Sequence, residues 1–323
     1  MAMGVRGEEI LRSALKGSRR DLSRLLSLIE SGQEINVHTQ DSWTLGVTGP
    51  PGSGKSSLIG NFVNYWSSRG DKVAVLAVDP SSPNSGGALL GDRMRMPSAD
   101  SGDSVFVRSL ATRNHPGGLS AYISTMIDCL AACGWDRIVI ETVGSGQSDY
   151  RIAAFADRIL LVDGPDRGDI VQAEKAGIIE LADIIAVNKS DMEGSEKAAE
   201  AIRSALSMDE NPPPVHLVCS HDGSGIDAMM DDIENCTPGA RSRLRARERL
   251  ISAWDFRLLN NPEINGVIDL LETGSITLEE AVKRLIQSEG GTCQKTLMYW
   301  QIMSITLLAG SEGMPSDASP MCQ

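Results

Sequence analysis

The sequence has few aromatic residues, few histidines and no long apolar segment. Phe, Tyr and Trp together make up 4% of its 323 residues, and four histidines are present. The longest apolar stretch, residues 297–309, contains Gln301 and Ser304 and is shorter than the roughly 20 residues that cross a bilayer, so we expect no membrane partner. The six cysteines include no CxxC pair and no Cys/His cluster at zinc-ligand spacing, which argues against a structural zinc site.

The sequence also lacks an excess of positive charge. Thirty Lys and Arg stand against 43 Asp and Glu, which gives a net charge of −13. We therefore expect no nucleic-acid partner, and any bound anion must be held by a local site. The first residues include Glu8 and Glu9 and fit neither a secretory signal nor an acid-poor transit peptide, so we expect a cytoplasmic protein.

Short β-branched runs alternate with helical patterns through the middle of the chain. This alternation predicts an α/β fold with a doubly wound, mainly parallel sheet and helices on both faces. The expected strands are 43–49, 72–79, 104–108, 137–141, 158–163, 183–188 and 215–219. In such sheets ligands bind beyond the carboxyl ends of the strands. The polar or glycine residues at these ends are Gly49, Asp79, Glu141, Asp163, Asn188 and Ser220.

Helical patterns flank this region on both sides. Apolar residues recur at helical spacing over residues 8–30, and three more helices are expected from residue 241 to residue 287. Thr277 and Glu280 form a capping box for the last of them. The expected organisation is an N-terminal helical segment (1–40), an α/β domain (41–237), a helical C-terminal extension (238–309) and a disordered tail (310–323).

Residues 49–56, Gly-Pro-Pro-Gly-Ser-Gly-Lys-Ser, match the phosphate-binding loop (P-loop) pattern between an expected strand and an expected helix (56–66). Glycines let the backbone N–H groups wrap around a β-phosphate, and Lys55 adds positive charge over the β- and γ-phosphate oxygens. The Ser56 hydroxyl can bind Mg²⁺ at a helix N-terminus that favours anions. The expected phosphate-binding residues are Gly49, Gly52, Ser53, Gly54, Lys55, Ser56 and Ser57.

The tetrapeptide Asn188-Lys189-Ser190-Asp191 follows the sixth expected strand and indicates guanine recognition. The Asp191 carboxylate can accept hydrogen bonds from the ring N–H and the exocyclic amine of guanine, whereas adenine would leave it unpaired. An unpaired buried carboxylate costs several kcal/mol, enough to exclude ATP. Residues 218–221 would close the base pocket with backbone N–H donors. The expected base-binding residues are Asn188, Lys189, Asp191, Ser220 and His221.

Magnesium needs hard oxygen ligands, and the candidates are Ser56, Asp79, Asp92 and Glu141. Gly144 can bring its backbone N–H to a γ-phosphate. No side chain is an obvious general base for the attacking water; Gln147 could orient the water or could serve as a hinge residue. We therefore expect slow intrinsic GTP hydrolysis that accelerates when a partner orders the loops.

Four blocks of the sequence, residues 79–96, 111–120, 141–149 and 175–191, resemble the G-protein chaperones of cobalamin-dependent methylmalonyl-CoA mutase, the MeaB/ArgK/MMAA-type family. The resemblance covers about residues 8–235. It implies a SIMIBI-class P-loop GTPase that uses GTP/GDP and Mg²⁺. Such a GTPase protects and reloads an adenosylcobalamin-dependent acyl-CoA mutase, either methylmalonyl-CoA mutase or a relative. Because the family's C-terminal helices form a dimerisation extension, a homodimer is also implied.

The resemblance further implies three switch segments. Residues 79–93 would be the first switch and residues 141–151 the second. Asp169, Gln172 and Lys175 would belong to a third switch that reaches the nucleotide only in the complex with the mutase. From the residues alone, these three fall on one face of a helix, and a solvated helix face is the alternative interpretation. The expected catalytic residues are Lys55, Gly144, Gln147, Asp169, Gln172 and Lys175.

Two other functions stay open at this stage. A SIMIBI-class metallochaperone GTPase that delivers nickel would need His-rich or Cys/His ligand sites, yet the histidines are scattered at positions 38, 115, 216 and 221. A phosphotransferase acting on a small molecule or protein is the second alternative. The guanine interpretation of Asp191 argues against ATP as its donor.

Overall fold

The computed structural model describes residues 5–31, 33, 35, 37–38, 41–79, 102–111, 122–142, 144, 151–165, 179–236, 242–259 and 261–288. The chain divides into two compact units, Met1–Trp254 and Asp255–Gln323. Asp92, Gln147, Asp169, Gln172, Lys175 and the tail expected at 310–323 lie outside the described residues.

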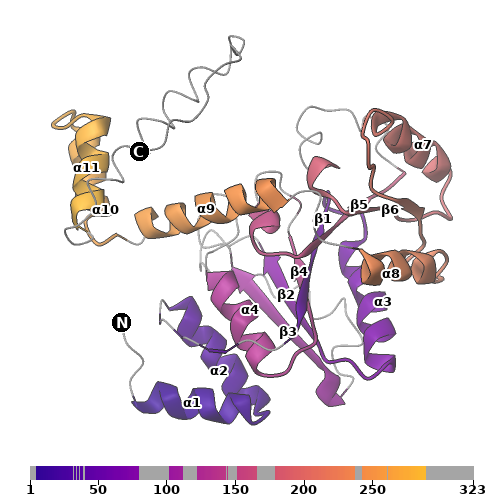
Figure 1. Ribbon diagram of the computed structural model, residues 1–323, viewed down its shortest axis with the longest axis horizontal. Coiled ribbons are helices and arrows are strands. Elements are labelled where there is room, and N and C mark those ends of the chain that lie inside the picture. Colours follow the sequence, from indigo (N-terminus) through magenta and orange to yellow (C-terminus); the bar gives the residue numbers. More distant parts are fainter. Residues whose placement is uncertain are drawn as a thin grey trace, which may run out of the picture. The chain divides into compact units, whose positions relative to one another are not determined.

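The first unit is built on a parallel sheet of seven strands in the order β3-β2-β4-β1-β5-β6-β7 (Figure 1). The strands are β1 (Trp43–Thr48), β2 (Val73–Asp79), β3 (Val105–Ala111), β4 (Arg137–Glu141), β5 (Arg158–Asp163), β6 (Ile184–Val187) and β7 (Val215–Leu217). The seven predicted strands and the doubly wound α/β fold are therefore confirmed. β3 extends past its predicted end at Arg108, because it pairs with β2 as far as Asp79 and Ala111.

Alternate strand residues face opposite sides of the sheet, and helices cover both. Val73 and Val75 belong to the core beneath α3 (Lys55–Ser68) and α8 (Ile226–Asn235). Ala74 and Leu76 belong to the core beneath α2 (Arg19–Glu30) and α4 (Tyr122–Ala132). α7 (Ser195–Ala205) packs over β5 and β6 on the α4 side. Burial on both faces explains the continuous apolar character of the strands.

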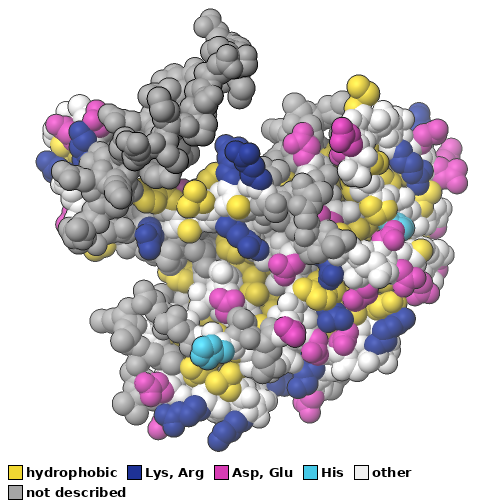
Figure 2. All heavy atoms as spheres, in the orientation of Figure 1, with side chains coloured by type: hydrophobic (Ala, Val, Ile, Leu, Met, Phe, Trp, Pro, Cys, Tyr) yellow, Lys and Arg dark blue, Asp and Glu magenta, His cyan; other side chains and the backbone are white. Residues whose placement is uncertain are grey.

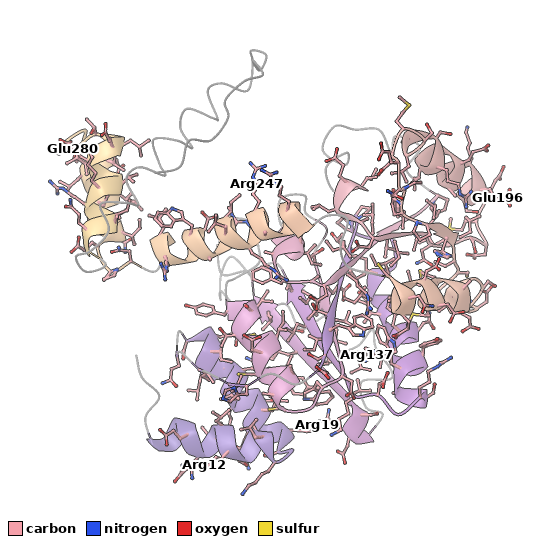
Figure 3. All side chains as sticks on the ribbon, in the orientation of Figure 1. Arg12, Arg19, Arg137, Glu196, Arg247 and Glu280 are labelled. Atoms are coloured by element: carbon pink, nitrogen blue, oxygen red, sulfur yellow. The ribbon has the colours of Figure 1, made fainter. Side chains whose placement is uncertain are left out.

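The N-terminal helices α1 (Val5–Leu15) and α2 pack into the core of this first unit. Leu22, Leu25, Leu26 and Ile29 of α2 are at most 2% exposed. Two arginines tie α2 to the edge strand β3. Arg108 of β3 donates a 3.1 Å hydrogen bond to the Ser23 carbonyl and pairs with Glu30. Arg19, labelled in Figure 3, donates to the Val105 carbonyl.

The three predicted C-terminal helices are present as α9 (Ser242–Leu259), α10 (Ile264–Glu272) and α11 (Leu278–Ser288). In the second unit, α10 and α11 bury Val267, Ala281 and Leu285 against each other. The predicted capping box is also observed: Thr277 N–H donates to Glu280 Oε2 at 2.9 Å, and Glu280 N–H donates to Thr277 Oγ1 at 3.2 Å. Among the described residues, no helix is long and apolar enough to span a bilayer.

Candidate functional site

The glycine-rich sequence 49–54 forms the turn between β1, at the centre of the sheet, and helix α3, which buries one face. A Cβ atom at Gly49 would lie 1.9 Å from the Val162 carbonyl oxygen of neighbouring β5, so only glycine fits there. Gly54 caps α3 with φ of +90°. Gly52 has φ of +80°, and in the described part of the chain no atom lies within 4 Å of a Cβ built on it. The turn therefore packs against β5 while leaving room at Gly52 for a ligand.

Lys55, the first residue of α3, points its ammonium back over this turn. The side chain is 6% exposed, and Nζ donates to the carbonyl oxygens of Gly49 at 2.8 Å and Pro50 at 3.1 Å. A buried ammonium held by loop carbonyls stands beside the helix N-terminus, where N–H groups also favour anions. The predicted cation of the phosphate-binding loop is therefore held at the loop itself.

Ser56 and Glu141 meet at the same edge of the sheet. β4 lies beside β1 with Val47 paired to Glu141, and the Ser56 hydroxyl donates to Glu141 Oε1 at 2.7 Å. Glu141 is 6% exposed. Hydroxyl and carboxylate oxygens are the donors that Mg²⁺ accepts, and a nucleotide-bound Mg²⁺ takes only one or two ligands from the protein. These two residues therefore fit a magnesium ion.

For the other two predicted metal ligands, Asp79 and Asp92, the structure describes no side chain near Ser56 and Glu141. Asp79 ends β2, which is separated from β1 by β4, and its side chain is not described. Asp92 lies outside the described residues. Within the described part of the chain there is also no group of three or more His, Cys, Asp or Glu side chains that could hold a metal ion. The described donor set is therefore Ser56 with Glu141.

Gly144 places the segment after β4 against the phosphate-binding turn. Its φ is +80°, and a Cβ atom on it would lie 2.1 Å from the Gly49 carbonyl oxygen. Just before it, the Thr142 hydroxyl donates to the Thr48 hydroxyl at 3.0 Å, and both threonines are buried. A larger residue at position 144 would push the two segments apart.

Asn188 joins the phosphate-binding turn to the loop after β7. Its Nδ2 donates to the Ser53 carbonyl at 2.8 Å and to Ser220 Oγ at 3.3 Å, while its Oδ1 accepts from Ser220 N–H at 3.0 Å. The side chain is fully buried. Its neighbour Lys189 has φ of +63°, a left-handed conformation that is uncommon outside glycine. The two predicted halves of the site are thus connected through one amide.

Asp191 is exposed and lies beside the same loop. The Cys219 thiol donates to Asp191 Oδ1 at 3.3 Å. From α3, Asn61 donates to the Ser220 carbonyl at 2.9 Å, and His221 is exposed. Neither Asn61 nor the thiol of Cys219 was predicted from the sequence. Each contacts a residue that is distant in the sequence, and no local motif indicates such a contact.

These positions fit a guanine nucleotide with its magnesium ion. The glycine turn with Lys55 suits phosphates, Ser56 with Glu141 suits Mg²⁺, and Asp191 beside the loop at 219–220 suits a guanine base. On the face shown in Figure 2, the acidic and basic side chains of the described residues are interspersed. The arrangement can therefore hold one nucleotide across the carboxyl ends of β1, β6 and β7.

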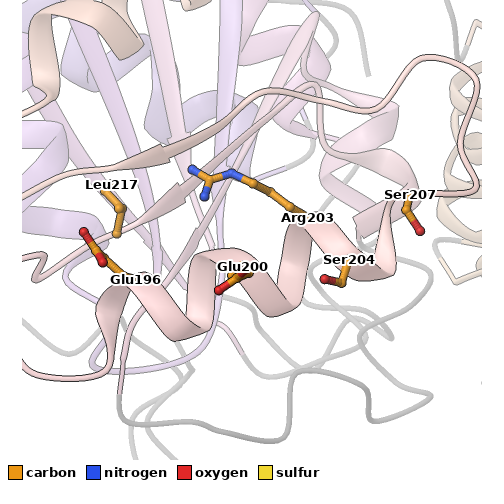
Figure 4. A pocket seen from close by; sticks show the side chains of 6 residues that line it. All are labelled: Glu196, Glu200, Arg203, Ser204, Ser207 and Leu217. Atoms are coloured by element: carbon orange, nitrogen blue, oxygen red, sulfur yellow. The ribbon is translucent and has the colours of Figure 1, made fainter.

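A separate hollow lies between α7 and β7 (Figure 4). Its volume is about 600 Å³, and its lining residues are Glu196, Glu200, Arg203, Ser204, Ser207 and Leu217. None of these was predicted to bind nucleotide. Arg203 donates to the Val215 carbonyl of the edge strand at 3.1 Å, which ties α7 to β7. The hollow is therefore distinct from the candidate nucleotide site.

Comparisons with known proteins identify the family. The family model described as methylmalonyl Co-A mutase-associated GTPase MeaB matches residues 25–260. A relative from Pyrococcus abyssi is 39% identical over 301 residues, which is 87% of this chain and 92% of that protein. GTPase ArgK of Escherichia coli is 34% identical over 241 residues, covering 68% of this chain and 73% of that protein.

Two further likenesses agree with this. The mitochondrial methylmalonic aciduria type A homolog of Mus musculus is 36% identical over 272 residues, covering 78% of this chain and 65% of that protein. The crystal structure of LAO/AO transport system kinase matches with a TM-score of 0.59 at 22% identity, over 88% of this chain and 98% of that one, which supports the fold. The chain therefore belongs to the MeaB family of P-loop GTPases and is related to ArgK and to the methylmalonic aciduria type A proteins.

Proposed function

We propose that this GTPase is a chaperone that protects an adenosylcobalamin-dependent acyl-CoA mutase and gates its cofactor loading. The mutase is methylmalonyl-CoA mutase or a relative. The observation that carries the proposal is the match to a family named for its association with methylmalonyl-CoA mutase, because residues 25–260 include both the phosphate-binding turn and the base loops. The contact from Asn188 to the Ser53 carbonyl supports a single nucleotide held across these two parts.

The nucleotide is GTP or GDP, with its phosphates over residues 49–57 and its base at Asp191. Lys55 stabilises phosphate charge, and the N–H groups at the start of α3 bind phosphate oxygens. Ser56 and Glu141 hold Mg²⁺, with Asp79 and Asp92 as further candidate ligands. When bound there, the ion would neutralise charge on the β- and γ-phosphates. Ser53, Ser57, Lys189, Ser220 and His221 complete the proposed binding residues.

GTP hydrolysis by the protein alone is slow, and the mutase accelerates it. The Gly144 N–H contacts the γ-phosphate, and Gln147 orients the attacking water. Asp169, Gln172 and Lys175 form the segment that reaches the nucleotide only in the complex. GTP binding orders these loops, and the mutase responds to that order. The protein acts in the cytoplasm as a homodimer formed through the C-terminal helices.

The decisive experiment is GTP hydrolysis with Mg²⁺ by the purified protein, alone and with an adenosylcobalamin-dependent acyl-CoA mutase from the same genome, with ATP as the control nucleotide. We expect turnover well below about 1 per second for the protein alone, since incomplete GTPase sites are slow, and stimulation by the mutase. Unstimulated turnover would contradict the chaperone role while leaving the GTPase intact. Transfer of the γ-phosphate to a molecule other than water would indicate a phosphotransferase instead.

A further inference from the structure

The turn that follows β7 is held by hydrogen bonds on both sides of Cys219. The Cys219 N–H donates to the Ser224 carbonyl, and the Gly223 N–H donates to the Cys219 carbonyl, each at 2.9 Å. The next residue, Ser220, donates its N–H to Asn188 Oδ1 at 3.0 Å. Cys219 itself is 2% exposed. Its thiol therefore projects from a backbone position that is closely constrained.

The helix that begins at the phosphate-binding turn also contacts this second turn. Asn61 of α3 donates its Nδ2–H to the Ser220 carbonyl at 2.9 Å. The following residue, Phe62, is fully buried beneath the sheet, so this part of α3 has little freedom to shift. The position of the turn at 219–220 is therefore set from α3 as well as from Asn188.

The Cys219 thiol makes a hydrogen bond to the Asp191 carboxylate. The distance from Sγ to Oδ1 is 3.3 Å. Asp191 is exposed, and an exposed carboxylate can rotate about its side-chain bonds unless a neighbour holds it. A guanine base needs both carboxylate oxygens at once, one for its ring N–H and one for its exocyclic amine. The hydrogen bond from the Cys219 thiol to Oδ1 limits the rotation of the Asp191 carboxylate that would break its pairing with guanine.

We propose that Cys219 and Asn61 are positioning residues for guanine recognition. Asn61 fixes the turn, and the Cys219 thiol in that turn holds the Asp191 carboxylate in the orientation that pairs with guanine. The inference rests on the proposed function, which assigns the guanine contact to Asp191. Because a thiol is a weak donor, it orients the carboxylate while leaving most of its hydrogen-bonding capacity for the base.

The test compares the equilibrium affinities of the full-length protein for GTP and for ITP, whose base lacks the exocyclic amine. The GTP:ITP affinity ratio reports the second hydrogen bond to Asp191. We expect Cys219→Ala to lower this ratio about fivefold, the change that one hydrogen bond of about 1 kcal/mol corresponds to. Cys219→Ser, which keeps a donor, restores the ratio. Asn61→Ala lowers it in the same direction.

Two matched variants control for the loss of side-chain atoms. Cys236→Ala removes another cysteine thiol, and Asn64→Ala removes an exposed amide from the same helix as Asn61. Both are expected to keep the wild-type GTP:ITP ratio. Thermal unfolding of every variant is also measured. If Cys219 or Asn61 had a purely structural role, its substitution would lower the melting temperature and reduce the affinities for GTP and ITP by the same factor. That result would overturn the positioning role.

An unchanged GTP:ITP ratio in Cys219→Ala, or a failure of Cys219→Ser to restore it, also overturns the inference. Asp191→Asn separates this failure from a failure of the proposed function. The proposed contact between Asp191 and guanine is contradicted if the wild-type protein shows no preference for GTP over ATP, or if Asp191→Asn leaves that preference intact. The positioning role of Cys219 and Asn61 is then contradicted as well. If Asp191→Asn abolishes the preference while Cys219→Ala changes nothing, only the positioning role is overturned.

Discussion

The Ser56 hydroxyl and the Glu141 carboxylate lie 2.7 Å apart, which joins the first turn of α3 to the last residue of β4. The contact depends on strand order, because β4 lies directly beside β1 and the turn after β1 leads into α3. It gathers two hard oxygen ligands next to the turn that carries Lys55. The proposed magnesium site can be tested at this pair.

Glu141→Gln keeps the shape of the side chain and removes its charge. We expect the Mg²⁺ concentration needed for tight GTP binding to rise at least about tenfold, the loss typical of a disturbed metal site. Titration of Mg²⁺ against a fluorescent GTP analogue measures it. Ser68→Ala, which changes an exposed residue at the other end of α3, should leave the Mg²⁺ requirement unchanged. An unaltered Mg²⁺ requirement in Glu141→Gln would contradict the assignment.

Lys55→Ala removes the buried ammonium from the phosphate-binding turn. Because charge-assisted hydrogen bonds to phosphate are the strong ones, GTP affinity should fall by about a hundredfold or more. Isothermal titration measures the affinity, and circular dichroism verifies that the fold is kept. Lys72→Ala, an exposed lysine before β2, is the matched control. Wild-type GTP affinity in Lys55→Ala would refute the role of this lysine.

Asp191→Asn replaces one carboxylate oxygen with an amide donor. Guanine then loses an acceptor, so GTP affinity should fall at least about tenfold and the preference for GTP over ATP should weaken. The affinity for xanthosine triphosphate should rise, since its base carries a carbonyl where guanine carries the amine. Competition binding with the three nucleotides measures the selectivity, with Asp231→Asn as an exposed control. An unchanged GTP:ATP ratio would be evidence against guanine recognition by Asp191.

Leu25→Ala tests whether α2 belongs to the core of the first unit. Leu25 is fully buried, and truncation of such a side chain leaves a cavity that costs about 2–5 kcal/mol. Urea denaturation should show that loss. Leu15 of α1 is 44% exposed, so Leu15→Ala should cost less than about 1 kcal/mol. Equal costs for the two variants would mean that α2 contributes little to the core.

Cys129 and Cys133 should make the protein sensitive to alkaline pH. Burial raises the pKa of Cys129 to about 12 and that of Cys133 to about 11, from the ordinary value of 9.0. The nearby Cys133 and Asp128 add to the shift at Cys129. Above pH 9 the unfolded chain loses these protons while the native protein keeps them. The buried Cys129 thiol should then lower the free energy of unfolding by about 1.4 kcal/mol per pH unit until its native pKa is reached, and the partly buried Cys133 thiol should lower it by less.

The measurement is the free energy of unfolding from pH 8 to pH 11 in reducing buffer, for the wild type and for Cys129→Ala. The variant should be less stable at pH 8, where the thiol is neutral in both states, and its stability should decline less steeply as the pH rises. Parallel curves for the two proteins would show that Cys129 ionises as readily in the native state as in the unfolded chain.

The strands and the phosphate-binding turn could be predicted because their signals are local. Residues 184–187 are an unbroken apolar run, and all four side chains are buried. The turn at residues 49–54 was recognisable from its glycines, and the structure places two of them, Gly49 and Gly54, where a Cβ atom would clash with neighbouring atoms. Local pattern is sufficient wherever one segment alone determines the conformation.

The contacts that orient the site could not be predicted in this way. Asn61 and Ser220 are 159 positions apart, and their hydrogen bond depends on how α3 and the turn after β7 meet across the sheet. The pairing of Arg108 with Glu30 likewise depends on α2 lying beside the edge strand. Ser220 was predicted from its position after the last strand, but Asn61, Arg108 and Glu30 have no distinctive neighbourhood of their own. The strand order has to be known before their contacts can be predicted.

Asn188 forms hydrogen bonds to both the phosphate-binding turn and the base loop with a single buried amide. Displacement of this amide would therefore disturb the phosphate-binding turn and the base loop together. A partner that accelerates exchange of GDP for GTP by loosening the base loop would have to break these Asn188 contacts and also the hydrogen bond from Asn61 to the Ser220 carbonyl.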